Sequence, residues 1–242
     1  MGDPPTICNG LRRMPSFPLK TFFAIGLSTL AVASAAAHPT SASSSASTDT
    51  LRLVRPTGPY PPRMPPFWYR SGAAPQEYRM ELSPSARFRG HFGAVIEHVT
   101  GSGQSFGTLA QAIRAAPYRG KRVVLRGWMK TLKADSAQMW LRIDAIDRSL
   151  AMDNMDDRAV KGTTAWHLYE IVMDVPANAN DIAFGFFLQG KGAMAVDDMT
   201  LRIAPDDARL TRFYDLSKET SDRPFRPARH VYDAPYNLDF ED

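Results

Sequence analysis

Two stretches decide the fold: residues 121–130 (KRVVLRGWMK) and residues 138–146 (QMWLRIDAI). In each, apolar side chains alternate with polar or aromatic ones, so that Met139, Leu141 and Ile143 face one way and their neighbours the other. A period of two is the pattern of a β-strand with one face in the core. Both stretches therefore predict strands.

Three further stretches extend this pattern. They are residues 166–175, 182–188 and 193–203. Gly, Asn and Asp separate the stretches at intervals of roughly ten residues, which is typical of an all-β sandwich. Residues 108–116 have good helix propensity, and taken alone this segment predicts a helix. It lies, however, between Gly107 and a turn-forming run at 118–121, where an antiparallel sheet could override the local preference.

Length, composition and charge limit the class of protein. The 242 residues, 44% hydrophobic and 22% charged, suit one globular domain with long flanks. Of the net charge of +4, Arg12, Arg13 and Lys20 less Asp3 contribute +2, which leaves 4 − 2 = +2 on the rest. This near balance gives no reason to expect nucleic-acid binding. A single cysteine excludes a disulfide framework within one chain.

Residues 1–37 have the pattern of a secretory signal peptide. Lys20 ends a basic start, an apolar run follows at 21–32, and small residues at 33–37 suit signal peptidase. The run is shorter than the about 20 residues of a membrane span. We predict a secreted or periplasmic protein without a stable membrane span after signal removal. An uncleaved N-terminal anchor is the alternative.

Residues 38–75 have the composition of a linker. A Ser/Ala/Thr-rich run at 40–50 precedes a proline-rich run at 55–66, and such runs favour flexible and polyproline II conformations respectively. We interpret the proline-rich run as a spacer, because no flanking pattern supports binding to a proline-recognising partner. The predicted sandwich then spans 76–204, and a C-terminal tail spans 205–242.

Nine short blocks have a recognisable order along the chain. They are GTLAQ (107–111), YRGKRV (118–123), LRGWMKT (125–131), MWLRID (139–144), AMDNM (151–155), KGTTAW (161–166), DVP (174–176), IAFG (182–185) and VDD (196–198). Together they resemble the galactose-binding-like jelly-roll domains of bacterial extracytoplasmic proteins, which are allied to carbohydrate-binding modules. The resemblance implies a jelly-roll β-sandwich in which the 108–116 segment is a strand. It implies no reaction, because members of this superfamily bind sugars, bind peptides or only stabilise a neighbour.

The chain departs from the family pattern at its first strand. Such jelly rolls usually open with Asn-x-x-Phe-Glu, and nothing before Tyr78 matches, whereas Asn237, Phe240 and Glu241 have that spacing. We therefore predict that residues 236–241 fold back as the missing edge strand, in cis or across a homodimer. The start of a second module and a disordered tail are the alternatives.

The search for catalytic motifs gives no candidate. None of the five histidines has a zinc-ligand spacing, and no G-x-S-x-G, S-x-x-K, phosphate-binding or dinucleotide motif occurs. We therefore predict a non-catalytic protein without a cofactor.

Oxygen-bearing side chains gather at two places. They are Asp153, Asn154, Asp156 and Asp157 in one loop, and Asp197 and Asp198 at the last strand. Calcium prefers such ligands, and related jelly rolls often hold a structural calcium through a C-terminal Asp, which makes Asp198 a candidate ligand. Arg158 and Lys161 flank the first group, so turn residues and surface ion pairs are the alternative.

A mixed aromatic and polar face is the candidate binding site. Trp140, Arg142 and Asp144 share one face of their predicted strand, and Asp153 and Asn154 follow on a loop. An aromatic ring can cover the C–H face of a sugar while charged groups bind its hydroxyls. The tryptophans can equally fill the core of a sandwich.

We predict a binding module for carbohydrate or a similar polar ligand. A structural or protein-interaction module that assembles through its C-terminal strand is the alternative.

Overall fold

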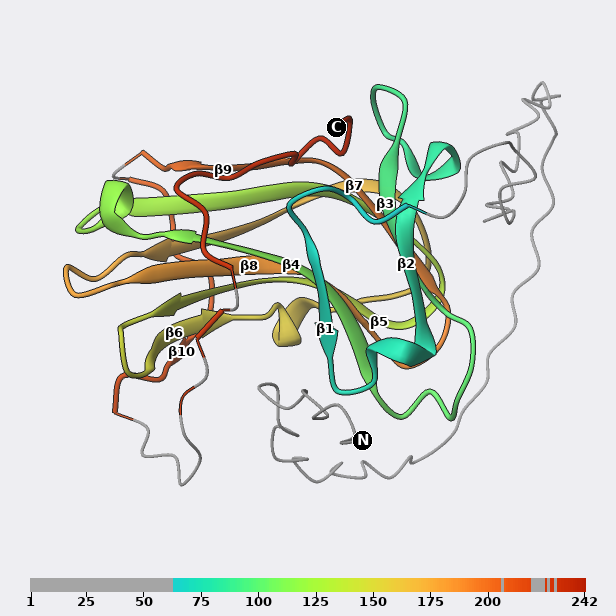
Figure 1. The fold of residues 1–242 in the computed structure, drawn as a ribbon, viewed down its shortest axis with the longest axis horizontal. Helices are drawn as coiled ribbons and strands as arrows, with labels where there is room; N and C mark the ends of the chain where they lie inside the picture. Colours follow the sequence, from blue (N-terminus) through green and yellow to red (C-terminus); the bar gives the residue numbers. More distant parts are fainter. Residues whose placement is uncertain (1–62, 206, 219–224, 226, 229) are drawn as a thin grey trace, which may run out of the picture. The chain divides into compact units, whose positions relative to one another are not determined.

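The described part of the chain is built from β-strands. The computed structural model describes residues 63–205, 207–218, 225, 227–228 and 230–242, so the predicted signal peptide and most of the predicted linker lie outside the described residues. The strands in the described residues are β1 (Tyr69–Gly72), β2 (Tyr78–Ser83), β3 (Gly93–His98), β4 (Phe106–Arg114), β5 (Arg122–Asp144), β6 (Ser149–Asp153), β7 (Val160–Asp174), β8 (Asp181–Gln189), β9 (Ala193–Ile203) and β10 (Tyr214–Asp215) (Figure 1). Short 3-10 turns lie at Pro75–Glu77, Pro84–Ala86, Ala116–Tyr118 and Asp156–Arg158.

One long strand, β5, belongs to both sheets of the sandwich. Its residues 123–132 pair with β9, and its residues 136–144 pair with β8. The first sheet therefore has the order β2-β3-β9-β5-β7, and the second has the order β1-β4-β8-β5-β6-β10. Every pairing between these strands is antiparallel. The predicted all-β jelly-roll sandwich is confirmed.

The sequence predicts two strands where the structure has one. Residues 131–137 (TLKADSA) join the two predicted stretches without a Gly or Pro that would turn the chain. The strand instead continues through register shifts against β7, and Lys133 adopts a φ of 48°. These irregularities bend β5 from one sheet into the other, as β-bulges do.

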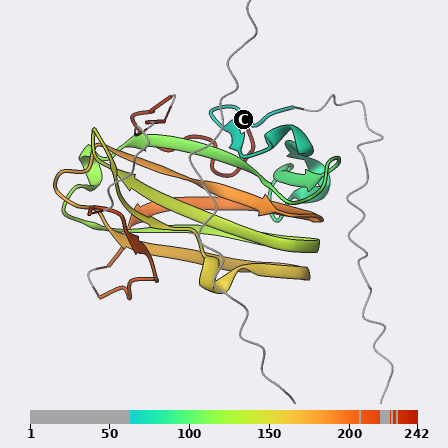
Figure 2. The ribbon, with the colours of Figure 1, turned by 90° about the horizontal axis from the view of Figure 1, so that it is seen from below.

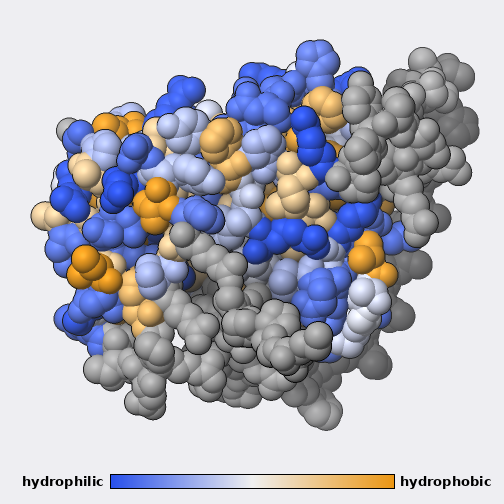
Figure 3. Space-filling view, viewed as in Figure 1, coloured by the Kyte–Doolittle hydropathy of each residue, from blue (hydrophilic) through white to orange (hydrophobic). Residues whose placement is uncertain are grey.

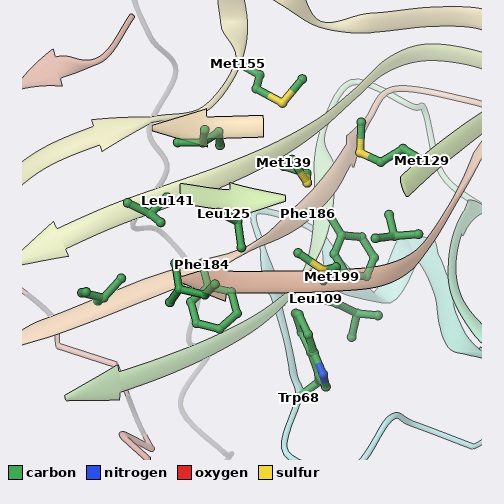
Figure 4. Packing of buried hydrophobic residues seen from close by; sticks show 14 of the residues in the cluster. Trp68, Leu109, Leu125, Met129, Met139, Leu141, Met155, Phe184, Phe186 and Met199 are labelled. Atoms are coloured by element: carbon green, nitrogen blue, oxygen red, sulfur yellow. The ribbon is translucent and has the colours of Figure 1, made fainter. Parts of the chain in front are cut away.

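The core lies between the two sheets and follows the alternation in the sequence. Met139, Leu141 and Ile143 are fully buried, as predicted, and they meet Phe184 and Phe186 of β8 (Figure 4). The ambiguous segment at 108–116 is strand β4, as the family resemblance implies. Among the described residues, no helix has the length and hydropathy needed to cross a membrane.

The C-terminal tail folds back in cis, but residues 236–241 form no strand, which corrects the predicted edge strand. Positive φ angles at Asn237 (47°) and Phe240 (61°) break the extended conformation. Phe240 is fully buried, with its ring 5.3 Å from that of Trp68, and Trp68 Nε1 donates to the Asn237 carbonyl at 3.0 Å. The strands at the two ends of the main strand order are β1 and β2.

The tail ties the two sheets together. Gln111 of β4 bonds to both main-chain groups of Tyr236 at 2.9 Å, and the Met199 N–H of β9 donates to the Leu238 carbonyl at 2.9 Å. These three bonds, together with the bond from Trp68 Nε1 to the Asn237 carbonyl, hold the tail against its own chain.

Candidate functional site

The predicted site residues Trp140, Arg142 and Asp144 share the outer face of the second sheet, as their alternation requires. Trp140 is only 5% exposed, and its Nε1 donates to Thr108 Oγ1 at 3.0 Å. Arg142 Nη2 donates to Asp144 Oδ2 at 2.8 Å, and the Asp144 side chain is 2% exposed. Ser149 Oγ donates to the other carboxylate oxygen at 2.8 Å. Each of the three side chains therefore makes hydrogen bonds within the protein.

The described C-terminal segment contributes to this burial. Trp140 and Phe187 form a small apolar cluster with Met152, and Leu216 and Val231 pack against it. On the face seen in Figure 3, the described hydrophobic residues lie singly among polar ones. The face predicted to bind ligand is thus covered rather than open.

Asp153 and Asn154 do not join the other three predicted residues. Asp153 lies opposite Leu141 in the β5–β6 ladder, so its side chain belongs to the other face of the strand from Trp140. Its carboxylate accepts bonds from Arg158 Nη2 at 2.7 Å and Thr211 Oγ1 at 2.6 Å. Asn154 is buried, and its Oδ1 has no hydrogen-bond partner among the described residues. The structure does not bring the five predicted residues to one place.

The candidate metal ligand Asp198 lies beside an arginine. Its carboxylate is 3.3 Å from Arg89 Nη1, and its backbone has a φ of 48°. Across the described ranges, no group of three or more His, Cys, Asp or Glu side chains is placed to hold a metal ion. A calcium site at Asp198 stays a prediction without further ligands.

An aromatic cluster lies on the outer face of the first sheet, where the sequence analysis did not place a site. The ring of Phe88 stacks on that of Trp128, with centroids 4.0 Å apart and planes at 18°, and lies 5.6 Å from Trp166. All three residues are half-buried, and Leu168 beside Trp128 in the next strand is 48% exposed. We call Phe88, Trp128 and Trp166 the aromatic platform.

The loop after β2 is fixed across this face by one buried carboxylate. Asp197 Oδ2 accepts the main-chain N–H groups of Phe88 at 2.6 Å and Arg89 at 2.9 Å. Burial raises the pKa of Asp197, and these N–H donors oppose that rise. Lys130 Nζ also donates to the Ser85 carbonyl at 3.2 Å. These hydrogen bonds therefore fix the loop that places the Phe88 ring over Trp128.

Charged groups surround the aromatic platform. The Lys130 ammonium lies 4.9 Å from the centroid of the Trp166 ring, and the Arg89 guanidinium lies 5.4 Å from that of Phe88. Arg126 Nε and Glu170 Oε2 are 3.1 Å apart, and both side chains are about half exposed, at 51% and 49%. Half-buried rings with accessible planar charged groups beside them are suited to a polar ligand that has apolar C–H faces.

The alternation of side chains in the sequence indicates one part of the aromatic platform. In residues 121–130, Val123, Leu125 and Met129 occupy one face, so Trp128 must share the opposite face with Arg126. This is the same pattern as Trp140 with Arg142. The contribution of Phe88 carries no comparable signal, because it comes from a loop that Asp197 holds in place.

This chain has a relative of similar sequence among known bacterial proteins. No protein-family model matches it. The chain is 31% identical over 179 residues to a Bacillus subtilis (strain 168) protein named as an uncharacterized HTH-type transcriptional regulator, YbfP. The match covers 72% of this chain and 56% of that relative, so the chain spans little more than half the relative's length.

Solved structures with a similar strand arrangement have low sequence identity. The xylan-binding domain CBM22-1 of Paenibacillus barcinonensis Xyn10C is 11% identical with a TM-score of 0.43, over 58% of this chain and 88% of that domain. A Stig cyclase, Fisc, from Fischerella sp. TAU is 13% identical with a TM-score of 0.47, over 62% of this chain and 92% of that one. The module TmCBM61, solved with β-1,4-galactotriose, is 14% identical with a TM-score of 0.41, over 58% and 91%.

Proposed function

We propose that this chain is an exported, non-catalytic binding module and that its aromatic platform binds carbohydrate. The observation in support is the aromatic platform itself, where half-exposed rings lie beside the exposed pair Arg126 and Glu170. The rings offer apolar surface to the C–H faces of a sugar, and the two charged groups offer donors and acceptors to its hydroxyls. The expectation of export rests on residues 1–37 of the sequence.

The relative supports a role in recognition. It is named as a transcriptional regulator, and its match to this chain is too long to lie within residues 1–62, so it extends into the sandwich. The described residues contain no α-helix, whereas a helix-turn-helix needs two. We infer that the described part of this chain recognises a ligand rather than DNA.

Retention on insoluble polysaccharides tests the proposal. The full chain is incubated with cellulose, xylan and chitin, and the bound fraction is measured. We expect retention on at least one, and at least about a tenfold weaker affinity for Trp128→Ala and Trp166→Ala, because each removes a ring that contacts the sugar.

Tyr236→Ala is the matched control, since it removes an exposed aromatic side chain outside the aromatic platform and leaves the main-chain bonds to Gln111 in place. Its retention should equal that of the unmodified chain. Failure of the unmodified chain to bind any of the polysaccharides overturns the proposal, as does full retention by both tryptophan variants when their thermal unfolding shows that they are folded.

A further inference from the structure

Strand β7 has one long edge without a neighbouring strand. Among the described strands, β7 (Val160–Asp174) pairs with β5 alone, and Figure 2 shows it at the lower border of the sheet. Near its C-terminal end this outer edge is covered: the Thr211 N–H donates to the Val172 carbonyl at 3.0 Å, and Arg158 Nη2 donates to the Glu170 carbonyl at 3.4 Å. Residues 163–168 have no such cover from the described chain.

The direction of the main-chain groups at this edge follows from these contacts. The Val172 N–H also donates outward, to Thr211 Oγ1 at 3.0 Å, so both main-chain groups of Val172 point away from β5. Every second residue of a strand points the same way, and the β5–β7 register is regular from Asp174 to His167. The N–H and C=O of Leu168 therefore point outward, to a side where no described residue bonds to them.

Two large apolar side chains lie on the outer face of the sheet at this open edge. Leu168 is 48% exposed, and Trp166 is half-buried on the same outer face of the sheet. Natural proteins usually protect an edge strand with proline, charge or a covering segment, because unpaired main-chain groups bind other strands. Residues 163–168 (TTAWHL) contain no proline, aspartate, glutamate, lysine or arginine.

We propose that two copies of this chain pair antiparallel through the open edge of β7. A register centred on His167 places Trp166 of each copy opposite Leu168 of the other, which forms two aromatic–aliphatic cross-strand pairs. A register centred closer to Val172 would bring the second copy against Thr211 and Arg158, which cover that part of the edge. In this register the open edge of one copy complements the same edge of the other, which favours a second copy over a different protein as the partner.

The pairing joins the first sheet of one copy to the first sheet of the other, so that they form one continuous sheet. A two-fold axis that pairs β7 with itself keeps the same faces on the same side, so both aromatic platforms lie on one side of the joined sheet. The dimer forms without any sugar, so its existence is independent of the proposed function.

The mass of the full chain in solution tests the proposal. We expect light scattering after gel filtration to give twice the chain mass of 26.8 kDa. Leu168→Pro removes an outward N–H without removing a bond to β5, and Leu168→Asp places a charge at the apolar contact. Each should raise the dissociation constant of the dimer at least about tenfold.

Ile146→Asp is the matched control, because Ile146 is 80% exposed outside the strands and should leave the dimer unchanged. Circular dichroism shows whether each variant is folded, and Leu168→Asp provides the test if Leu168→Pro does not fold. A monomeric unmodified chain at the highest soluble concentration overturns the proposal. A dimer that is equally tight in a folded Leu168→Asp variant overturns it as well.

Discussion

The outer faces of the two sheets receive similar side chains from the same strand and differ in what covers them. β5 presents Trp128 next to Arg126 on the first sheet, and Trp140 next to Arg142 on the second. The first pair stays partly open, whereas Trp140 lies in an apolar cluster on which the distant Leu216 packs. Alternation thus assigns a side chain to a face, and segments far away in the sequence decide whether that face is open.

The largest expected effect is the difference in stability between a tryptophan variant of the second sheet and one of the first. Trp140→Ala leaves a cavity among Phe187 and Met152 and removes the bond to Thr108, so we expect the free energy of unfolding to fall by about 3 kcal/mol. Trp166→Ala removes a half-exposed ring and its contact with Lys130, for a loss of about 1 kcal/mol. Urea unfolding of both variants measures the difference. Equal losses would mean that the two faces are equally covered.

A smaller effect concerns how the aromatic platform is held. Asp197→Ala leaves the N–H groups of Phe88 and Arg89 without their acceptor, so we expect a loss of about 2 kcal/mol. Acrylamide should then quench the tryptophan fluorescence more strongly, because Phe88 no longer covers Trp128. Asp198→Asn is the control, since Asn tolerates the positive φ and loses only a partly exposed ion pair. Unchanged quenching in Asp197→Ala would show that the loop is held by other contacts.

The smallest effect is a pH dependence at the tail that links the sheets. Burial raises the pKa of Glu241, but the N–H groups of Phe92 and His91 and the His91 side chain outweigh it, so the pKa is lowered overall. Because its pKa is lower in the folded protein, Glu241 stabilises the fold at pH values above its pKa in the unfolded chain, about 4.3. This contribution is lost as the pH falls through the pKa of Glu241 in the folded protein.

Comparison with Glu241→Gln measures this contribution. At neutral pH we expect the variant to be less stable by at most about 1 kcal/mol, and the difference should shrink as the pH falls below about 4.3 and vanish below the lowered pKa of Glu241. A difference in stability that persists in acid would mean that the shape of the Glu241 side chain, and not its charge, causes the loss in the variant.

The sequence predicts the fold class because alternation is a local property. Met139, Leu141 and Ile143 were assigned to the core from their period alone, and they are buried. The sequence predicts linker where the structure has the strand Tyr69–Gly72, because four residues after a proline-rich run show no period. The pairing of this strand with β4 depends on residues about forty positions away. The tail was expected as a strand, but its positive φ angles depend on the space that Phe240 fills in the core.

The candidate site was less predictable for a related reason. The pattern of Trp140 with Arg142 and Asp144 is as strong in the sequence as that of Trp128 with Arg126. No local feature distinguishes the two patterns. Leu216 packs against the cluster that contains Trp140, whereas Phe88 stacks on Trp128, and both are tertiary contacts.

The contact of Trp68 with the tail has a consequence for the time course of folding. Trp68 and Asn237 are 169 positions apart, so at synthesis rates of about 5–20 residues per second Trp68 waits roughly 10 to 30 seconds for its partner. Contacts between such distant residues also slow the folding reaction itself. During this interval the indole lacks Phe240 and the Asn237 carbonyl, and the nascent chain presents an apolar site that a chaperone can bind.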